Sequence, residues 1–409
     1  MTEPILILVV CHDAGGARSV IPVARSLSQK KVRVLAAVAG PAIAIWKAEC
    51  PENPAVTVPD QLTVADAVAL LRKDPVGLLL SASGLFNLME HTFRKAAQQE
   101  GIRSVSILDS WINYSEKFER KIDGSLEICR PNLVCVLDQV TYDGMITAGF
   151  DPQELVITGA PNLEASAEYV RSNGLVLRKA WRTEQELKDG DLVVTFFSDP
   201  FYWIPDGRPC IATGGLMAPD GTSLYGYTSL DVLGSVLDEL QTACLAHDKK
   251  CQLILKPHPL EYIDSLRPVV EARNYSHVKV SLQTQGTAAR WIAVADAVIG
   301  MMSIALLEAS LAGKPSLSVQ LDLLHSGAED PCLGNRLSYT YPVFDKGTLR
   351  SAMNSLAAGH YQTLMTTPNG RLKLHGAADN VAEVVLAQMN RENPGAKGFV
   401  RAPIREVSR

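Results

Sequence analysis

The first hydrophobic feature of the chain is an unbroken apolar run over residues 5–11, Ile-Leu-Ile-Leu-Val-Val-Cys. A strand that is covered on both faces shows this pattern, since neither set of alternating side chains meets water. Residues 17–29 then place apolar side chains at helical spacing, and a second β-branched run follows at 32–38. The three segments predict a β-α-β unit with parallel strands.

The same alternation of apolar runs and amphipathic segments continues along the first part of the chain. It predicts a strand at 76–80, a helix at 88–100, and strands at 103–108, 133–137 and 155–158. Because strands that alternate with helices form a parallel sheet, residues 1–163 are predicted to be one Rossmann-like domain.

A polar, charged stretch over residues 164–190 precedes a second alternating series, and we interpret it as an interdomain segment. The second series predicts strands at 191–197, 252–256, 278–281, 297–300 and 316–319, and helices at 230–247, 263–272, 288–295 and 304–312. We therefore predict a second Rossmann-like domain over 191–390 and a surface tail over 391–409. The predicted fold class is α/β, with two doubly wound domains that face each other across a cleft.

Composition and charge narrow the class of protein without changing this picture. The 47% hydrophobic and 20% charged residues are typical of a globular protein, and the net charge is −5. Basic residues form no long run, which argues against nucleic acid as a partner. The N-terminal apolar run is only as long as a strand and is preceded by an acidic residue. We therefore expect a cytoplasmic protein with neither a signal peptide nor a transmembrane segment.

The cysteines give no sign of a metal centre. All eight are scattered along the chain, without a Cys-x-x-Cys pair or a Cys/His cluster. We therefore expect reduced thiols in the core, with no zinc site and no disulfide framework.

Four loops that follow predicted strands carry polar residues, and such loops bind ligands in open α/β sheets. The first reads Cys-His-Asp-Ala-Gly-Gly-Ala over residues 11–17. Gly15 and Gly16 let a backbone approach closely. His12 and Asp13 are placed to bind an acceptor, with Asp13 as its catalytic general base. The alternative is structural, with Asp13 as a helix cap. Without the spacing G-x-G-x-x-G, no nicotinamide or flavin cofactor is predicted.

The second loop lies in the second predicted domain and reads Leu-Ile-Leu-Lys-Pro-His-Pro over residues 253–259. Its two prolines restrict the backbone around His258. Lys256 and His258 are placed to neutralise phosphate oxygens, and His258 to assist a leaving group as charge develops on it. A purely structural histidine is the alternative.

The third loop lies within residues 296–315, where a short strand ends just before Ser303. Ser303 is expected at the N-cap of the following helix. Backbone amides, the hydroxyl and the helix dipole there favour an anion such as a nucleotide phosphate. A plain helix cap is the alternative, and the two roles are compatible. Glu308 lies in the apolar helix and needs a partner, for which ribose hydroxyls are one option.

The fourth loop reads Leu-Asp-Ser-Trp-Ile-Asn-Tyr over residues 108–114. Trp111 is expected to stack on a flat face of an acceptor, while Asp109 and Asn113 bind its hydroxyls. Packing of the aromatic ring into the core is the alternative. The expected acceptor site then combines this loop with the first one.

The order of these segments resembles the glycosyltransferase B (GT-B) fold. The likeness rests on the Gly-containing first loop, the Lys-Pro-His-Pro segment, and the Asp-x₆-Ser and Leu-x-Glu-Ala-x₃-Gly-Lys-Pro patterns of the third loop. It is nearest to the bacterial surface-polysaccharide branch with HP and serine motifs, which includes sialyltransferases, Kdo transferases and CDP-glycerol glycerophosphotransferases. The resemblance implies that His258 and Ser303 contact the donor phosphate and that Glu308 holds the ribose.

The resemblance also implies an activity. It points to a metal-independent glycosyltransferase that moves a sugar from a nucleotide-activated donor to a small-molecule or glycan acceptor, with no cofactor. The alternatives are a CDP-alditol phosphotransferase, a non-hydrolysing UDP-sugar 2-epimerase and a nucleotide-sugar binding protein without turnover. The oligomeric state stays open, with a homodimer as one option.

Overall fold

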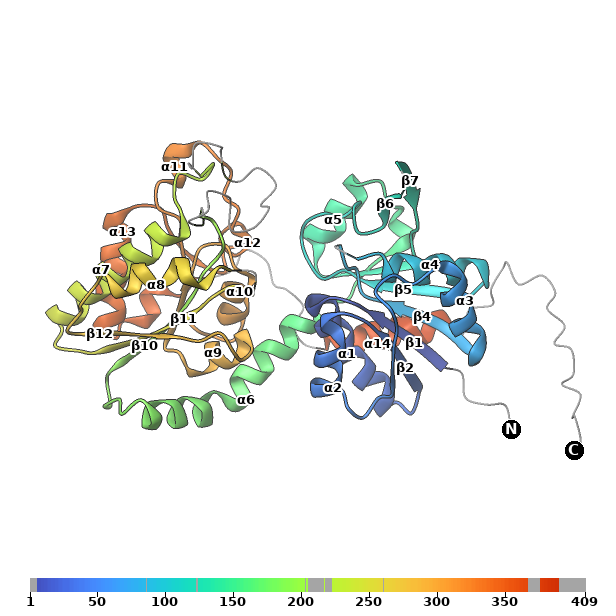
Figure 1. Ribbon diagram of the computed structural model, residues 1–409, viewed down its shortest axis with the longest axis horizontal. Helices are drawn as coiled ribbons and strands as arrows, with labels where there is room; N and C mark the ends of the chain where they lie inside the picture. Colours follow the sequence, from blue (N-terminus) through green and yellow to red (C-terminus); the bar gives the residue numbers. More distant parts are fainter. Residues whose placement is uncertain are drawn as a thin grey trace, which may run out of the picture. The chain divides into compact units, whose positions relative to one another are not determined.

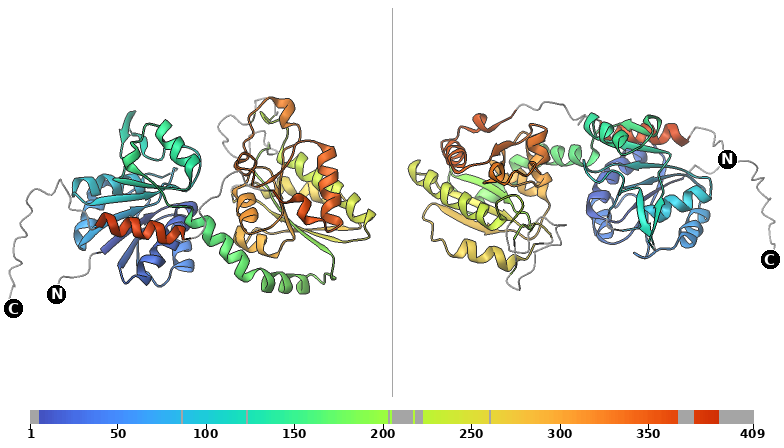
Figure 2. Two further views of the ribbon diagram at one scale, coloured as in Figure 1. Left: turned by 180° about the vertical axis from the view of Figure 1, so that it is seen from behind. Right: turned by 90° about the horizontal axis from the view of Figure 1, so that it is seen from above.

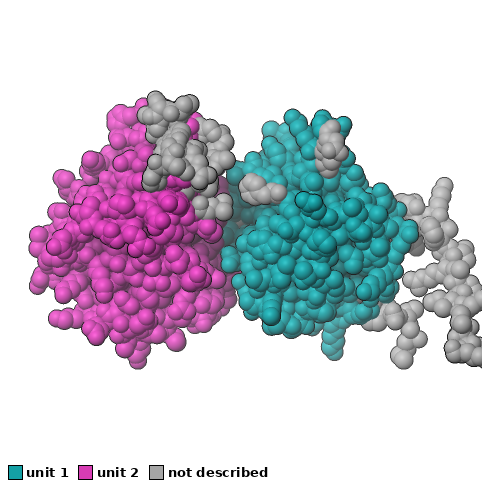
Figure 3. All heavy atoms as spheres, in the orientation of Figure 1, with its two compact units in different colours: residues 1–164, 372–409 teal, residues 165–371 magenta. Residues whose placement is uncertain are grey.

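The computed structural model describes residues 6–85, 87–122, 124–202, 204, 217, 223–259, 261–366 and 376–389 (Figure 1). The chain divides into two compact units (Figure 3). Unit 1 comprises Met1–Glu164 and Leu372–Arg409, and unit 2 comprises Ala165–Arg371. No helix in the described part of the chain combines the length and the apolar character needed to cross a membrane.

Unit 1 contains a seven-stranded sheet in the order β3-β2-β1-β4-β5-β8-β9, and all of its pairs are parallel. The strands are β1 (Leu6–Cys11), β2 (Arg33–Val38), β3 (Ala55–Thr57), β4 (Val76–Ser81), β5 (Arg103–Ile107), β8 (Leu133–Val136) and β9 (Leu155–Ile157). The order reverses between β1 and β4, and ligands bind beside such a switch point in doubly wound folds. β6 (Glu119–Ile122) and β7 (Ser125–Ile128) form a separate antiparallel hairpin.

Helices cover both faces of this sheet, which explains the unbroken apolar run of β1. Ile7 and Val9 point into one core, while Leu8 and Val10 point into the other. The first core is closed by α1 (Ala14–Gln29), α2 (Pro41–Glu49) and α14 (Ala377–Met389), and the second by α3 (Val64–Lys73) and α4 (Met89–Gln99). The remaining helices are α5 (Gln139–Thr147) and η1 (Pro152–Glu154).

Unit 2 repeats the design with a six-stranded parallel sheet in the order β12-β11-β10-β13-β14-β15. The strands are β10 (Leu192–Phe197), β11 (Cys251–Lys256), β12 (Val278–Leu282), β13 (Ala297–Gly300), β14 (Ser316–Val319) and β15 (Tyr341–Val343). Here the strand order reverses between β10 and β13.

The helices of unit 2 also form two layers. One core is closed by α7 (Ser229–Ala246), α8 (Ile263–Glu271) and α13 (Lys346–Ala357), and the other by α6 (Pro161–Glu184), α9 (Ala288–Val294) and α10 (Ile304–Leu311). α11 (Leu323–Ser326), α12 (Leu333–Arg336) and η2 (Tyr361–Leu364) complete the unit. The rings of Trp181 on α6 and Trp291 on α9 meet edge to face, with centroids 5.2 Å apart.

The predicted fold class of two Rossmann-like α/β domains is confirmed, but the segment boundaries differ in two places. The stretch 164–190, interpreted as an interdomain segment, is largely the long helix α6, most of which packs on unit 2. The predicted second domain, 191–390, included α14. Instead α14, the red helix of Figure 2, lies on the sheet of unit 1 and packs against α1, because its buried side chains close the core there. The predicted tail, 391–409, lies outside the described residues.

Two positions on α14 test this packing. Val385 is fully buried in the core of unit 1, whereas Ala387 is exposed on the same helix. We expect Val385→Asp to lower the free energy of unfolding by about 3 kcal/mol or more, because it buries an unpaired charge. Ala387→Asp should change it by less than about 0.5 kcal/mol. Chemical denaturation measures both values, and equal losses in the two variants would contradict the packing.

Candidate functional site

Asp13 stands at the carboxyl end of β1, beside the switch point of unit 1. Its backbone is extended, and Oδ1 accepts a hydrogen bond from the amide of Gly16 at 2.6 Å. Asp13 is therefore the N-cap of α1, as the structural alternative expected. The cap uses one carboxylate oxygen, while Oδ2 faces Gly84 in the loop after β4. Capping consequently leaves this second oxygen available for chemistry.

Glu90 on the first turn of α4 is a second carboxylate at this edge. It is 1% exposed, and Oε1 accepts from the amide of His12 at 2.9 Å. Within the described residues, Oε2 has no hydrogen-bond partner. A Cβ built on Gly84 would lie 2.9 Å from Asp13 Oδ2 and 3.2 Å from both oxygens of Glu90, so the two carboxyl groups are neighbours. Burial, and then the charge of Asp13, raise the pKa of Glu90.

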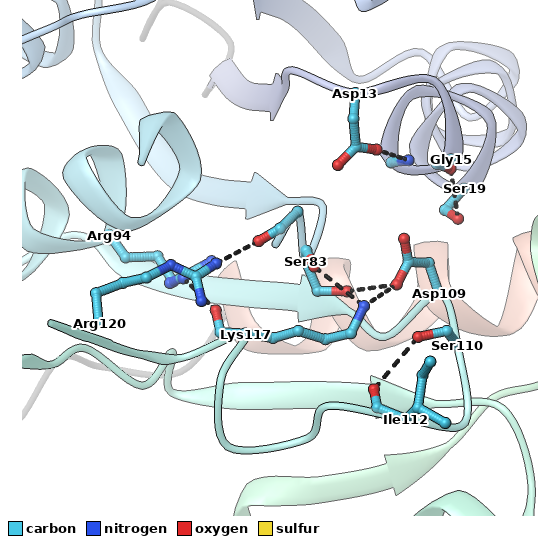
Figure 4. Close-up of polar contacts among 12 residues, drawn as sticks. Asp13, Gly15, Ser19, Ser83, Arg94, Asp109, Ser110, Ile112, Lys117 and Arg120 are labelled. Atoms are coloured by element: carbon cyan, nitrogen blue, oxygen red, sulfur yellow. Dashed lines mark hydrogen bonds and ion pairs between the residues drawn. The ribbon is translucent and has the colours of Figure 1, made fainter. Parts of the chain in front are cut away.

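Asp109, which follows β5, forms a third part of this edge. Figure 4 shows it directed toward Ser83 and Lys117. Ser83 Oγ donates to Asp109 Oδ1 at 3.1 Å, and Lys117 forms an ion pair with the same oxygen. Lys117 Nζ also donates to the carbonyl of Ser83 at 3.2 Å, and its side chain is only 5% exposed. The orientation of Asp109 is thus fixed by two neighbours.

The exposed Gly15 keeps the space beside these carboxylates open. A Cβ at this position would lie 3.5 Å from Asp109 Oδ2 and 3.6 Å from Asp13 Oδ1. Gly16 is needed for a different reason, because its Cβ would come within 2.7 Å of Ala82 Cβ. The two glycines therefore divide the predicted roles, ligand access and close packing, between them.

Two buried arginines support the loops that carry these groups, and neither was among the predicted site residues. Arg120 donates to the carbonyl of Gly84 at 2.5 Å, and Arg94 donates to the carbonyl of Lys117 at 3.0 Å (Figure 4). Burial lowers the pKa of Arg94 to about 10, so it stays charged at neutral pH. The guanidinium of Arg94 also lies over the ring of Phe118.

The other residues predicted for the acceptor site of unit 1 differ in their surroundings. His12 is half-buried, with Nε2 3.3 Å from Asp60 Oδ1. Asn113 is exposed in a left-handed conformation. Trp111 is 6% exposed, and its indole donates to Asp138 Oδ2 at 2.8 Å. The expectation that Trp111 stacks on an acceptor is therefore corrected, because its ring is packed into the protein.

Lys256 ends β11 in unit 2 and His258 follows it, as predicted. Lys256 Nζ donates to the carbonyl of Thr284 at 3.1 Å, and burial lowers its pKa. The imidazole of His258 is half-buried, and burial lowers its pKa too, so the neutral form prevails at neutral pH. The amide of His258 donates to Glu261 Oε2 at 2.9 Å. Glu261, which was not among the predicted site residues, therefore fixes the turn that presents the imidazole.

Ser303 is the N-cap of α10, and its hydroxyl accepts from the amide of Ala305 at 3.4 Å. The preceding amides have another partner. Asp199, directly after β10, accepts from the amide of Met302 at 3.2 Å and is 7% exposed. A carboxylate of the chain thus occupies part of the amide cluster that was expected to bind phosphate.

Glu308 lies on α10 and is half-buried. Its Oε2 accepts from the hydroxyl of Ser166 on α6 at 2.6 Å. The expected need for a hydrogen-bonding partner is thus met, at least at this oxygen, by the chain itself. A ribose hydroxyl would share the carboxylate with Ser166.

The described residues contain no group of three or more His, Cys, Asp or Glu side chains arranged to hold a metal ion. The chain does contain one Asp-x-Asp sequence, Asp189-Gly190-Asp191, a pattern found in metal-dependent sugar transfer. It precedes β10, at the opposite end of the sheet from Lys256 and Ser303. Asp191 there accepts from the amide of Lys188 at 2.8 Å, which makes the pair part of a turn.

Comparison with known proteins was made by sequence and by structure. No protein-family model matches the chain, and no curated protein matches it in sequence. A Listeria monocytogenes protein described as a candidate UDP-N-acetylglucosamine 2-epimerase is 11% identical, with a TM-score of 0.65, over 96% of this chain and 99% of that one. The UDP-GlcNAc 2-epimerase from Neisseria meningitidis, solved with UDP-GlcNAc bound, is 10% identical, with a TM-score of 0.61, over 94% and 100%. MurG from Acinetobacter baumannii is 12% identical, with a TM-score of 0.50, over 94% and 100%.

Likenesses at this level of identity establish the fold. Both sheets are parallel and reverse their strand order once, as doubly wound domains do. The chain therefore has the GT-B fold, which it shares with these epimerases and with MurG. The predicted GT-B fold is confirmed, while the branch with HP and serine motifs stays a prediction.

The ion pair of Lys117 and Asp109 has a measurable consequence. We expect Lys117→Ala to lower the free energy of unfolding by about 3 kcal/mol, because it leaves a largely buried carboxylate without its cation. Lys121→Ala, at an exposed position of the neighbouring hairpin, should change it by less than about 0.5 kcal/mol. Chemical denaturation of both variants provides the test. A Lys117→Ala variant as stable as the control would show that the pair contributes nothing.

Proposed function

We propose that this protein is an enzyme that isomerises the sugar of a nucleotide-activated sugar, as a non-hydrolysing sugar-nucleotide epimerase does. Unit 2 binds the nucleotide part, and unit 1 carries the groups that move protons. The neighbouring carboxyl groups of Asp13 and Glu90 are the observation on which the proposal rests.

Binding of the diphosphate is assigned to the carboxyl edge of the unit 2 sheet. Lys256 supplies positive charge there, while His258 and Ser303 supply hydrogen bonds to phosphate oxygens. Glu308 binds the ribose together with Ser166. The assignment is supported by the position of these residues after β11 and β13, and by solved neighbours of the same fold that include an epimerase with UDP-GlcNAc bound.

Proton transfer is assigned to Asp13 and Glu90. Inversion of the carbon next to the one that bears the nucleotide diphosphate needs a base to remove its proton, and the electron pair forms a double bond as the diphosphate leaves. An acid then returns a proton to the opposite face as the diphosphate adds back to the neighbouring carbon. Asp13, with Oδ2 outside the helix cap, acts as the base. Glu90 acts as the acid, since burial and the charge of Asp13 favour its protonated form. The product is an isomer of the substrate, so the reaction consumes neither an acceptor nor an oxidant.

Metal-independent glycosyl transfer is the second candidate. It needs a single base for an acceptor hydroxyl, and Asp13 would serve. The observation that favours it is the exposed Gly15 between Asp13 and Asp109, which leaves room for a hydroxyl beside two carboxylates. In this alternative His12, Gly16 and Asn113 would complete the acceptor site.

The products distinguish the two reactions. With UDP-GlcNAc in D₂O, an epimerase should release an isomeric UDP-sugar without any acceptor, and the product should carry deuterium at the inverted carbon. NMR and mass spectrometry detect both. Free nucleotide that appears only when an acceptor is added would identify a transferase instead, or a CDP-alditol phosphotransferase if CDP-linked donors alone react. Binding without any turnover would identify a nucleotide-sugar binding protein.

Glu90→Gln tests the acid directly. We expect the rate of isomerisation to fall by at least about 100-fold, because the amide has no proton to transfer. Affinity for UDP-GlcNAc should stay within about threefold of the wild type, since the donor site is assigned to unit 2. Glu100→Gln is the matched control, because Glu100 follows the same helix and forms a surface ion pair with Arg72. An unchanged rate in Glu90→Gln would refute the assignment.

His258→Ala tests the donor site. A bound ligand raises the melting temperature of the folded protein, so a panel of CMP, CDP, UDP, GDP and dTDP should identify the nucleotide. We expect the shift caused by the best ligand to shrink in His258→Ala and in Ser303→Ala. His247→Ala, at the end of α7, is the control. Shifts equal to that of the wild type in both site variants would contradict the assignment.

A further inference from the structure

A buried carboxylate occupies the backbone amides at which the proposed phosphate site begins. Asp199 Oδ2 accepts from the amide of Met302 at 3.2 Å, and the amides of Met301 and Ser303 also stabilise its charged form. These three residues connect β13 to the N-terminus of α10. Asp199 thus already satisfies amide donors that a helix N-terminus offers to an anion.

Glu261 is a second buried carboxyl group in the same place. It is 8% exposed, and its Oε2 accepts from the hydroxyl of Ser198 and from the amide of His258. Burial raises its pKa to about 7, and the charge of Asp199 adds to the effect. The two carboxyl groups are therefore close enough to repel each other when both are ionised.

No lysine or arginine in the described part of unit 2 is paired with either carboxyl group. Lys256, on the neighbouring strand, donates to Thr284 instead. The groups that face the two carboxyls are hydroxyls, backbone amides and the His258 turn, and they include Ser198, Tyr202 and Tyr227. An added diphosphate would therefore meet the negative charge of carboxyl groups that have no paired cation among the described residues of unit 2.

We propose that a nucleotide diphosphate binds unit 2 only when Asp199 carries a proton, so that donor binding takes up one proton from the solvent. The inference rests on the proposed function, because it concerns the same donor site. Phosphate oxygens and the Asp199 carboxylate are both acceptors that compete for the amides of residues 301–303, and their charges repel. Protonation removes the repulsion and turns Asp199 into a hydrogen-bond donor to a phosphate oxygen.

The direction of the pH dependence follows from this requirement. Burial raises the pKa of Asp199 to about 6, so the protonated form becomes scarcer as the pH rises above that value. Affinity should then fall by up to about tenfold for each further pH unit. Three other titratable groups lie near the site, namely His258, Tyr227 and Glu261. The first two have pKa values shifted away from this range, and Glu261 bonds to groups other than the amides of residues 301–303. Burial lowers the pKa of His258 and raises that of Tyr227, while Glu261 bonds to Ser198 and His258.

UDP-GlcNAc is the probe for the experiment, because it lacks the terminal phosphate monoester whose second pKa lies near 6. Isothermal titration calorimetry in buffers of different ionisation enthalpy measures the protons taken up on binding. For the wild type at about pH 7.5 we expect an uptake approaching one proton, and an affinity that weakens about tenfold per pH unit above that value. Thermal unfolding confirms that each variant is folded.

Asp199→Asn keeps an acceptor for the Met302 amide but carries no charge. It should bind UDP-GlcNAc with no proton uptake, independently of pH, and up to about 100-fold more tightly than the wild type at about pH 8, two pH units above the pKa of Asp199. Glu261→Gln should keep the proton uptake of the wild type. Asp345→Asn, which alters the exposed N-cap of α13, is the matched control.

The outcomes separate the inference from the proposed function. Binding of UDP-GlcNAc by the wild type without proton uptake would overturn the inference and leave the proposed function standing. Uptake that disappears in Glu261→Gln but persists in Asp199→Asn would overturn it as well, because another group would be the one that titrates. Failure of the folded wild type to bind UDP-GlcNAc at any pH would overturn both.

Discussion

Strands that are covered on both faces restrict where a sheet can carry polar groups. In each unit, side chains of the central strands alternate between two apolar cores closed by helices, and a charge placed there would have neither water nor a partner. Loops, helix N-termini and solvent meet where the strands end. The polar residues considered for function gather at the carboxyl ends for this reason, with Asp13 and Asp109 in unit 1 and Asp199 and His258 in unit 2.

The two units stabilise buried carboxyl groups in different ways. In unit 1, Asp109 is balanced by the ammonium of Lys117, which ties the charge to a fixed geometry. In unit 2, Asp199 and Glu261 rest on amides and a hydroxyl, and burial raises the pKa of each toward neutrality. Glu90 in unit 1 resembles the latter group. The same type of side chain therefore forms an ion pair at one position, whereas burial raises its pKa at others.

The sequence predicted those elements whose pattern is set by burial on both sides. The runs at β1 and β13 are apolar without a break, and β10 is interrupted only by Thr195. The positions of all three agree with the structure to within a residue or two. Several elements were missed because they are short, half-exposed or distant along the chain from the core that they complete. They include α2, α3, α5, α13, α14, β3, β15 and the β6–β7 hairpin.

The candidate site was predictable to a similar degree. Asp13, Lys256, His258 and Ser303 were found because they directly follow apolar runs. Glu90 was not, since it stands nine residues beyond β4 on a helix without a motif. One feature of the sequence could have indicated Glu261, which is its position three residues after His258 in a proline-rich turn. Trp111 shows the opposite limit, because an aromatic residue in a loop has the same sequence pattern whether it stacks on a ligand or packs inside.

The return of α14 to unit 1 has a consequence for how the protein is made. On the ribosome, the first 164 residues emerge without the helix that seals one of their cores, and all of unit 2 is synthesised before that helix appears. Unit 2 is thus inserted between the two segments of unit 1 and can finish folding while unit 1 still exposes apolar surface. Chaperones bind exposed apolar surface of this kind, so we expect the nascent unit 1 to bind one.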